Sequence, residues 1–260
     1  MPDGAIIRPH EDPPAGLGCA IDTNTHPRWD KSGSNYIYGR DWFGFKALPG
    51  GGRYANGSFY HLGVYGSWWS STEYTSTRAW TRSMNRNNGY VRHVIYPKTY
   101  GFSLRCVRDP SGEIEFNHPD GELYQSDYED GSENRYDSVK IGDQIWTMKN
   151  LITTKYQNGN NITTGLSDGD WSQATSGAYT IYPHANVDGI ASEQAMIDAY
   201  GILYNWYAVD NGLVDNNGYR VPTDDDWSEL KDYLILQYDI HFSNVAVVLK
   251  SCRQVNHPLA

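Results

Sequence analysis

The sequence has few cysteines, few basic residues and no long apolar run, and each shortage excludes a class of protein. Three Cys among 260 residues are too few for a disulfide scaffold, although they allow one bridge and one free thiol. No segment approaches the roughly 18 apolar residues that a membrane-spanning helix needs. The 31 acidic residues outnumber the 21 basic ones, and the resulting net charge of −10 opposes binding to nucleic acid phosphates.

Aromatic residues and glycine are abundant instead. The chain has 21 Tyr, 9 Trp and 26 Gly. A sequence this rich in aromatics buries enough area to fold, which argues against disorder. The glycine content, with many Asn and Ser, favours a loop-rich fold of short strands over a helical bundle. Residues 1–14 are polar and rich in proline and show no signal peptide, so we expect a disordered or extended leader there.

Charge divides the chain. The segment 110–137 contains nine acidic residues and one basic residue, a net charge of −8 out of −10. It is also rich in Gly, Pro, Ser and Asn, which predicts a solvated acidic linker between a block at 15–109 and a block at 138–260. An acidic surface loop within a single domain is the alternative.

The second block carries clear local signals. Val139 and Ile141, the turn Gly142-Asp143 and the apolar pair Ile145-Trp146 predict a β-hairpin. A helix is expected over Ser192–Tyr200, ending at Gly201. A stronger helix follows Pro222, with Thr223 as N-cap and Asp226 at the capping-box position. The acids 224–226 suit the first turn of that helix, where its dipole favours anions, and a metal site there is the alternative.

The first block shows no convincing helix. Residues 44–60 are turn and strand material, and 66–100 is polar and aromatic with little periodicity. Gly101–Arg108 alternates, with Phe102, Leu104 and Cys106 on one face of a predicted strand. Cys106 is therefore expected to be a buried core thiol.

Long motifs in both blocks resemble one family. The stretches YDSVKIGDQIWTMKNL (136–151), AYGILYNWYAV (199–209) and GYRVPTDDDWSELKDYL (218–234) are similar to the N-terminal half of the Fibrobacter succinogenes major paralogous domain. FGFKALPGGGRYANGSFYHLGVYGSWWSSTE (43–73) and YGFSLRCVRD (100–109) are similar to its C-terminal half.

The resemblance implies an α+β fold of the formylglycine-generating-enzyme-like branch of the C-type-lectin-like class. Such a fold is loop-rich, with short antiparallel strands and two or so helices. Family members are typically secreted or surface lipoproteins of Bacteroidetes and relatives, so the expected location is extracellular or at the cell surface. The expected function is a non-catalytic ligand-binding or adhesion module for a glycan or a surface protein. The alternative is a cysteine-dependent oxidase of the formylglycine-generating type.

The order of the two halves departs from the family pattern. The C-terminal half, 15–109, precedes the N-terminal half, 138–260. The chain is either a fragment across two tandem copies or a circular permutant, and in both cases we expect the halves to pack as one domain. In the family order, 11 residues would separate Cys252 from Cys19, which makes these two the candidate disulfide. A reactive pair at the same positions would suit the enzyme alternative.

No catalytic or phosphate-binding motif occurs in the sequence, and no metal-ligand spacing is seen among the eight His. No cofactor is expected, and a structural calcium ion is left open. The segment 74–100 combines basic, aromatic and Asn side chains inside an acidic protein, a mixture typical of binding surfaces. Trp68 and Trp69 are assigned to the core. The predicted ligand-binding residues, expected largely on one exposed face, are Arg78, Trp80, Arg82, Asn85, Asn87, Tyr90, Arg92 and Tyr96. The loops around 158–176 are the alternative location, and a solvated loop set without a ligand is the alternative for the segment itself.

Overall fold

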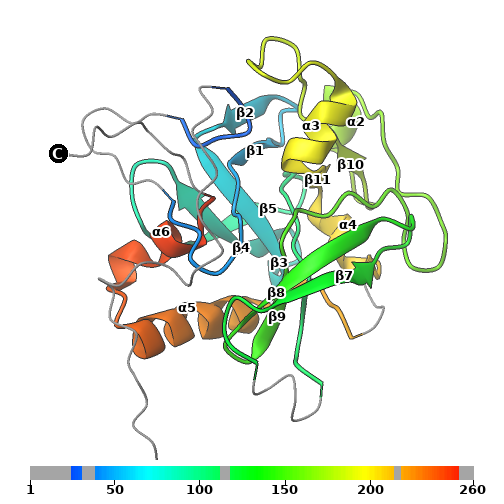
Figure 1. Cartoon of the computed structure of the whole chain (residues 1–260). Helices are drawn as coiled ribbons and strands as arrows, with labels where there is room; N and C mark the ends of the chain where they lie inside the picture. Colours follow the sequence, from blue (N-terminus) through cyan, green and yellow to red (C-terminus); the bar gives the residue numbers. More distant parts are fainter. Residues whose placement is uncertain (1–24, 31–38, 112–117, 214–217, 252–260) are drawn as a thin grey trace, which may run out of the picture.

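A computed structural model describes residues 25–30, 39–111, 118–213 and 218–251 (Figure 1). Within these ranges the fold is mixed and loop-rich, with short antiparallel strands in four small sheets and five α-helices. The leader 1–14 and both candidate disulfide residues, Cys19 and Cys252, lie outside the described residues. None of the described helices is long and apolar enough to cross a membrane.

The segment that showed little periodicity forms a three-stranded antiparallel sheet, which contains the two longest strands. Its strands are β3 (Tyr65–Thr75), β4 (Arg78–Asn85) and β5 (Arg92–Pro97), in the order β3-β4-β5. Five consecutive residues of β3, from Gly66 to Ser70, are buried, because both faces of the sheet are covered there. Burial on both faces removes the alternation by which a half-exposed strand is recognised. Trp68 and Trp69 are fully buried, as predicted.

A glycine-rich hairpin precedes this sheet. It consists of β1 (Gly50–Arg53) and β2 (Phe59–Leu62), and β1 and β2 both contact β3. Gly51 has a φ of 65°, and a Cβ atom there would lie 2.5 Å from the carbonyl oxygen of Tyr60. Only glycine allows both the backbone angle and this approach of the two strands.

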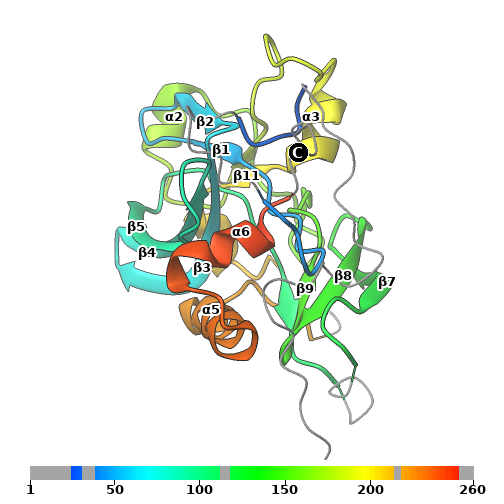
Figure 2. The same cartoon turned by 60° about the vertical axis from the view of Figure 1, so that its left-hand side comes forward.

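A four-stranded sheet joins residues from the two blocks. Its order is β6 (Val107–Arg108), β9 (Gln144–Thr147), β8 (Arg135–Ile141) and β7 (Leu123–Glu129). The predicted hairpin is confirmed as β8 and β9, with Gly142 at a φ of 61° in the turn. Strand β6 pairs with β9 through Val107 and Trp146, across about forty residues of sequence. The two larger sheets lie beside each other in both views (Figures 1 and 2).

The acidic segment is a correction to the sequence analysis. Residues 118–137 do not form a linker: they supply β7 and the first residues of β8. Tyr128 and Tyr136 of this segment are buried, and the Tyr136 hydroxyl donates to the buried Asp130. The linker was predicted from net charge and composition, which do not show that these two tyrosines pack in the core.

Gly101–Arg108 is a second correction. Only Val107 and Arg108 form a regular strand, while 101–103 make isolated bridges. All eight residues are buried, so neither face of this segment is solvated. The burial of Cys106, its thiol unpaired, is as predicted.

The two expected helices are present, and each begins where it was predicted to begin. α3 (Glu193–Tyr200) has Ser192 as N-cap and Gly201 as C-cap. α5 (Asp224–Tyr238) begins with the complete capping box of Thr223 and Asp226. The remaining α-helices have five residues each: α2 (Asp168–Ser172), α4 (Trp206–Asp210) and α6 (Val245–Leu249). A 3-10 turn, η1 (Phe242–Asn244), precedes α6, and a small sheet pairs β10 (Tyr179–Thr180) with β11 (Leu203–Tyr204).

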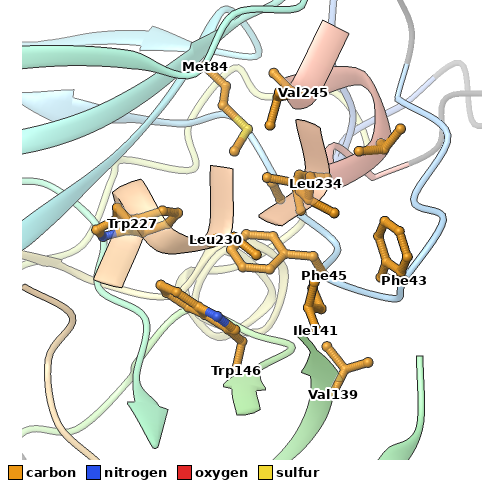
Figure 3. Packing of buried hydrophobic residues seen from close by; sticks show 14 of the residues in the cluster. Phe43, Phe45, Met84, Val139, Ile141, Trp146, Trp227, Leu230, Leu234 and Val245 are labelled. Atoms are coloured by element: carbon orange, nitrogen blue, oxygen red, sulfur yellow. The ribbon is translucent and has the colours of Figure 1, made fainter. Parts of the chain in front are cut away.

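Hydrophobic clusters combine side chains from both blocks. In one cluster, Phe45 packs against Trp146 and Trp227, with ring centroids 5.6 and 6.0 Å apart (Figure 3). Leu230 and Leu234 of α5 lie beside these rings in Figure 3. A second cluster gathers Trp69 and Phe102 with residues of the second block such as Tyr204 and Trp206. Residues on both sides of the acidic segment therefore share each core.

Candidate functional site

The β4–β5 register divides the predicted ligand-binding residues between two faces of the sheet. Trp80 lies opposite Ile95, whereas Ala79 lies opposite Tyr96. Since neighbouring residues of a strand point to opposite faces, Arg78, Trp80 and Arg82 share one face, and Arg92 and Tyr96 lie on the other. The expected single exposed surface is therefore not formed.

Arg82 is a structural residue. Its side chain is 3% exposed, and its Nη2 atom lies 2.7 Å from Oδ1 of Asp224. The same guanidinium donates to the backbone oxygen of Asp224 and to the hydroxyl of Ser228. These bonds fasten the first turn of α5 to the sheet, so Arg82 is not available to a ligand.

The loop after β4 is partly structural. Asn85 is buried, and its side-chain oxygen accepts from the backbone N–H of Asn87 at 2.6 Å. Its carbonyl oxygen accepts from the buried Lys250 ammonium. Asn87 and Tyr90 are exposed, and the Tyr90 ring lies 5.8 Å from that of Phe242.

On the first face, Trp80 stacks on His93 with ring centroids 3.7 Å apart, and Tyr74 meets Trp80 edge-on at 5.0 Å. His93 in turn lies 2.9 Å from Asp224. Arg78 is exposed at the far end of this row. The arrangement is a row of aromatic rings along this face of the sheet.

The opposite face forms a pocket of about 170 Å³ between the β1–β2 hairpin and β5. Arg92 and Tyr96 line it, together with six ring and polar side chains from earlier in the chain. We call this site the aromatic pocket; its side-chain lining is Tyr54, Tyr60, His61, Tyr65, Ser67, Ser83, Arg92, Val94, Tyr96 and Phe102, and the backbone of Gly51 and Gly52 completes the wall.

The rings of the aromatic pocket support one another. Tyr54 packs against Tyr60 with centroids 4.7 Å apart, and His61 meets Tyr65 edge-on at 5.1 Å. Tyr96 contacts Phe102 at 5.0 Å. A Cβ atom on Gly52 would lie 2.7 Å from the Phe102 ring, so glycine is what lets the hairpin approach it. The rings are thereby fixed before any ligand arrives.

The pocket is neutral to cationic. Burial raises the pKa of the Tyr54 hydroxyl to about 12 and also raises the pKa of Tyr96, so both stay protonated at neutral pH. Arg92 is exposed, and no carboxylate among the described residues pairs with it. No carboxylate lines the pocket. It therefore offers flat apolar faces, hydroxyls and one guanidinium.

The one cysteine among the described residues is not suited to nucleophilic chemistry. Burial raises the pKa of the Cys106 thiol far above its ordinary value, which opposes a nucleophilic role. Over the described part of the chain, no three His, Cys, Asp or Glu side chains are placed to hold a metal ion. The loops around 158–176, the alternative location, contribute no residue to the aromatic pocket.

The comparison with family models gives one match. The model of the Fibrobacter succinogenes major domain covers residues 22–108 and 139–251. The chain belongs to the Fibrobacter succinogenes major domain family. The searches of curated proteins and of solved structures found no match.

The two matched segments of the Fibrobacter succinogenes major domain leave out 109–138, which corresponds closely to the acidic segment. All residues that line the aromatic pocket lie within the first matched segment. The family domain thus contains the whole pocket.

Sequence reasoning missed the hairpin side of the pocket. The glycine-rich run 48–53 falls within the predicted turn and strand material, and Tyr54, Tyr60, His61 and Tyr65 are not among the predicted ligand-binding residues. The signal that identifies them is glycine next to closely spaced aromatics, because a missing Cβ allows a ring to approach the backbone. In this chain that ring is Phe102.

Proposed function

We propose that this protein is a non-catalytic ligand-binding module of the extracellular space or cell surface, and that its ligand is a glycan held in the aromatic pocket. The observation that carries the proposal is the gathering of six ring side chains and Arg92 around one hollow without a carboxylate. The short-strand architecture and family membership support the C-type-lectin-like fold that the resemblance implies.

The chemistry of the lining suits a sugar. A pyranose ring has an apolar face that packs on an aromatic ring and a hydroxyl rim that needs donors and acceptors. Binding sites commonly combine ring walls with a few fixed polar groups, and the tyrosine hydroxyls, Ser67, Ser83 and Arg92 supply them. The volume of the hollow is about 170 Å³. Pockets for drug-sized ligands have volumes of about 300 Å³ or more. The hollow therefore fits one terminal sugar, with the rest of the glycan outside.

A glycan array with matched variants tests the proposal. Arg92→Ala and Tyr60→Ala remove exposed groups from the pocket, and each should weaken binding of the best array ligand about tenfold, the effect of one good contact. Arg78→Ala is the control, because it removes the same charge from an exposed position on the opposite face.

Two results would contradict the proposal. One is an array on which the folded protein retains no glycan. The other is a bound glycan whose affinity falls with Arg78→Ala but not with Arg92→Ala, which would move the site to the Trp80 face.

A further inference from the structure

A second hollow shares no lining residue with the aromatic pocket. Residues between 148 and 152 and residues of α3 form part of its wall. The hollow has a volume of about 250 Å³. Four basic side chains and one carboxylate line it, in a protein whose net charge is −10. They are Lys46, Arg105, Arg135, Lys149 and Asp198.

The buried member of this set is Arg105, which is 1% exposed. Its guanidinium donates to Oδ1 of Asn150 and to the backbone oxygens of Phe45, Lys46 and Thr147. All four acceptors are neutral. An interior charge without a carboxylate contact is expensive, because its hydration is lost and no counterion replaces it.

No carboxylate among the described residues forms an ion pair with Arg105. Asp41 is close enough to act on Arg105 electrostatically, but its Oδ1 accepts from the backbone N–H of Lys46 at 2.7 Å. Asp198 accepts from the Gln194 side chain at 2.8 Å, and Glu129 pairs with Arg135. Burial lowers the pKa of Arg105 to about 9, so it remains charged at neutral pH.

Most of the remaining wall is apolar. Met148 is buried, and Leu48, Ile152 and Ile197 are half-buried. Lys46 and Lys149 are exposed, so the lining combines two accessible ammonium groups with a buried guanidinium and apolar side chains.

We propose that this hollow binds a small carboxylate that carries a compact apolar body. The carboxylate supplies the missing negative charge beside Arg105 and the two lysines, and the apolar body packs on Met148, Leu48 and Ile197. A free branched-chain acid and the C-terminal leucine of a peptide have this chemistry in common.

Titration followed by amide NMR on the full chain tests the proposal. The probes are 4-methylpentanoate, its amide, N-acetyl-leucine and N-acetyl-leucinamide. Both acids should bind at millimolar concentration and shift the amide signals of Asn150 and Gly201, whereas the two amides should not. Stronger binding of N-acetyl-leucine identifies a chain end as the natural ligand, and stronger binding of 4-methylpentanoate identifies a free acid.

Variants of the two exposed lysines avoid the unfolding that loss of Arg105 would cause. The double variant K46A/K149A should weaken binding of the better acid about tenfold. Lys155→Ala is the control, since Lys155 is exposed and does not line the hollow. The proposal is overturned if neither acid binds, if the amides bind equally well, or if Lys155→Ala weakens binding as much as the double variant does.

Discussion

Several buried charged side chains form hydrogen bonds between parts of the chain that are distant in sequence. Arg82, Arg105 and Lys250 are each at most 3% exposed. Lys250 donates to the carbonyl oxygens of Asn85 and Asn88, and its ammonium lies 4.9 Å from the centre of the Trp29 ring. These buried donors stabilise one particular arrangement of the chain, because breaking one of their hydrogen bonds leaves a charge in the interior without a partner.

Arg82 and Arg78 give the first prediction, because both lie on β4 and point to the same face. Arg82→Ala should destabilise the fold by roughly 3–5 kcal/mol, since it leaves Asp224 without its buried partner. Arg78→Ala should change stability by less than about 0.5 kcal/mol. Urea unfolding measures both. Equal effects of the two substitutions would show that Arg82 is not part of the core.

Asp41 gives a prediction about pH. Burial raises its pKa from 3.8 to about 6, so the folded protein holds a proton that the unfolded chain has released between these values. The stabilising contribution of protonated Asp41 is complete below about pH 4 and is lost as the pH rises through about 6. Asp41→Asn keeps an acceptor for Lys46 and tolerates the φ of 43°.

The Asp41→Asn variant should therefore be more stable than the parent at pH 7 by roughly 1–3 kcal/mol, with the difference vanishing toward pH 4. Urea unfolding at a series of pH values checks this. A constant difference across the series would contradict the assigned pKa.

At the scale of elements, local signals determine what sequence reasoning finds. α3, α5 and the β8–β9 hairpin were predicted correctly, because caps and turn glycines act within a few residues. β3 and β4 were missed, because both faces of β3 are covered from Gly66 to Ser70 and Arg82 is buried by a helix 142 residues away. Arg92 and Tyr96, two of the predicted ligand-binding residues, line the aromatic pocket. The register that separates them from Trp80 is set by strand pairing, which composition does not reveal.

The capping box of α5 gives the prediction at this scale. Thr223→Ala removes the oxygen that accepts from the Asp226 N–H, and it should lower stability by about 1 kcal/mol. Thr223→Ser retains the hydroxyl and should keep most of that stability. The midpoints of urea unfolding compare the two. If serine costs as much as alanine, the methyl group of Thr223, and not the cap, carries the effect.

At the scale of the whole molecule, the two blocks depend on each other. Trp69 donates to the carbonyl oxygen of Tyr204, and Trp68 to the side chain of Asn150. β6 completes the sheet of β7, β8 and β9. The order of the motifs predicts that this arrangement arises either by circular permutation or from tandem copies of the domain.

Splitting the chain tests this dependence. Fragments 1–109 and 110–260, expressed separately, should not unfold cooperatively, because each lacks part of both clusters. Mixed at equal concentration, they should associate and regain the near-ultraviolet circular dichroism of the intact protein. A cooperative thermal transition in either fragment alone would contradict the shared core.

Strand β7 has a consequence for how copies of the molecule behave toward one another. It is the end strand of its sheet, and such an edge is a ready template for a strand of a second chain. Here the edge carries Asp127 and Glu129, and its register shifts between Tyr124 and Tyr128, with Ser126 at a φ of 50°. Two such edges would bring irregular backbones together, which opposes the formation of a regular ladder. We therefore expect β7 to resist edge-to-edge pairing between copies of the molecule.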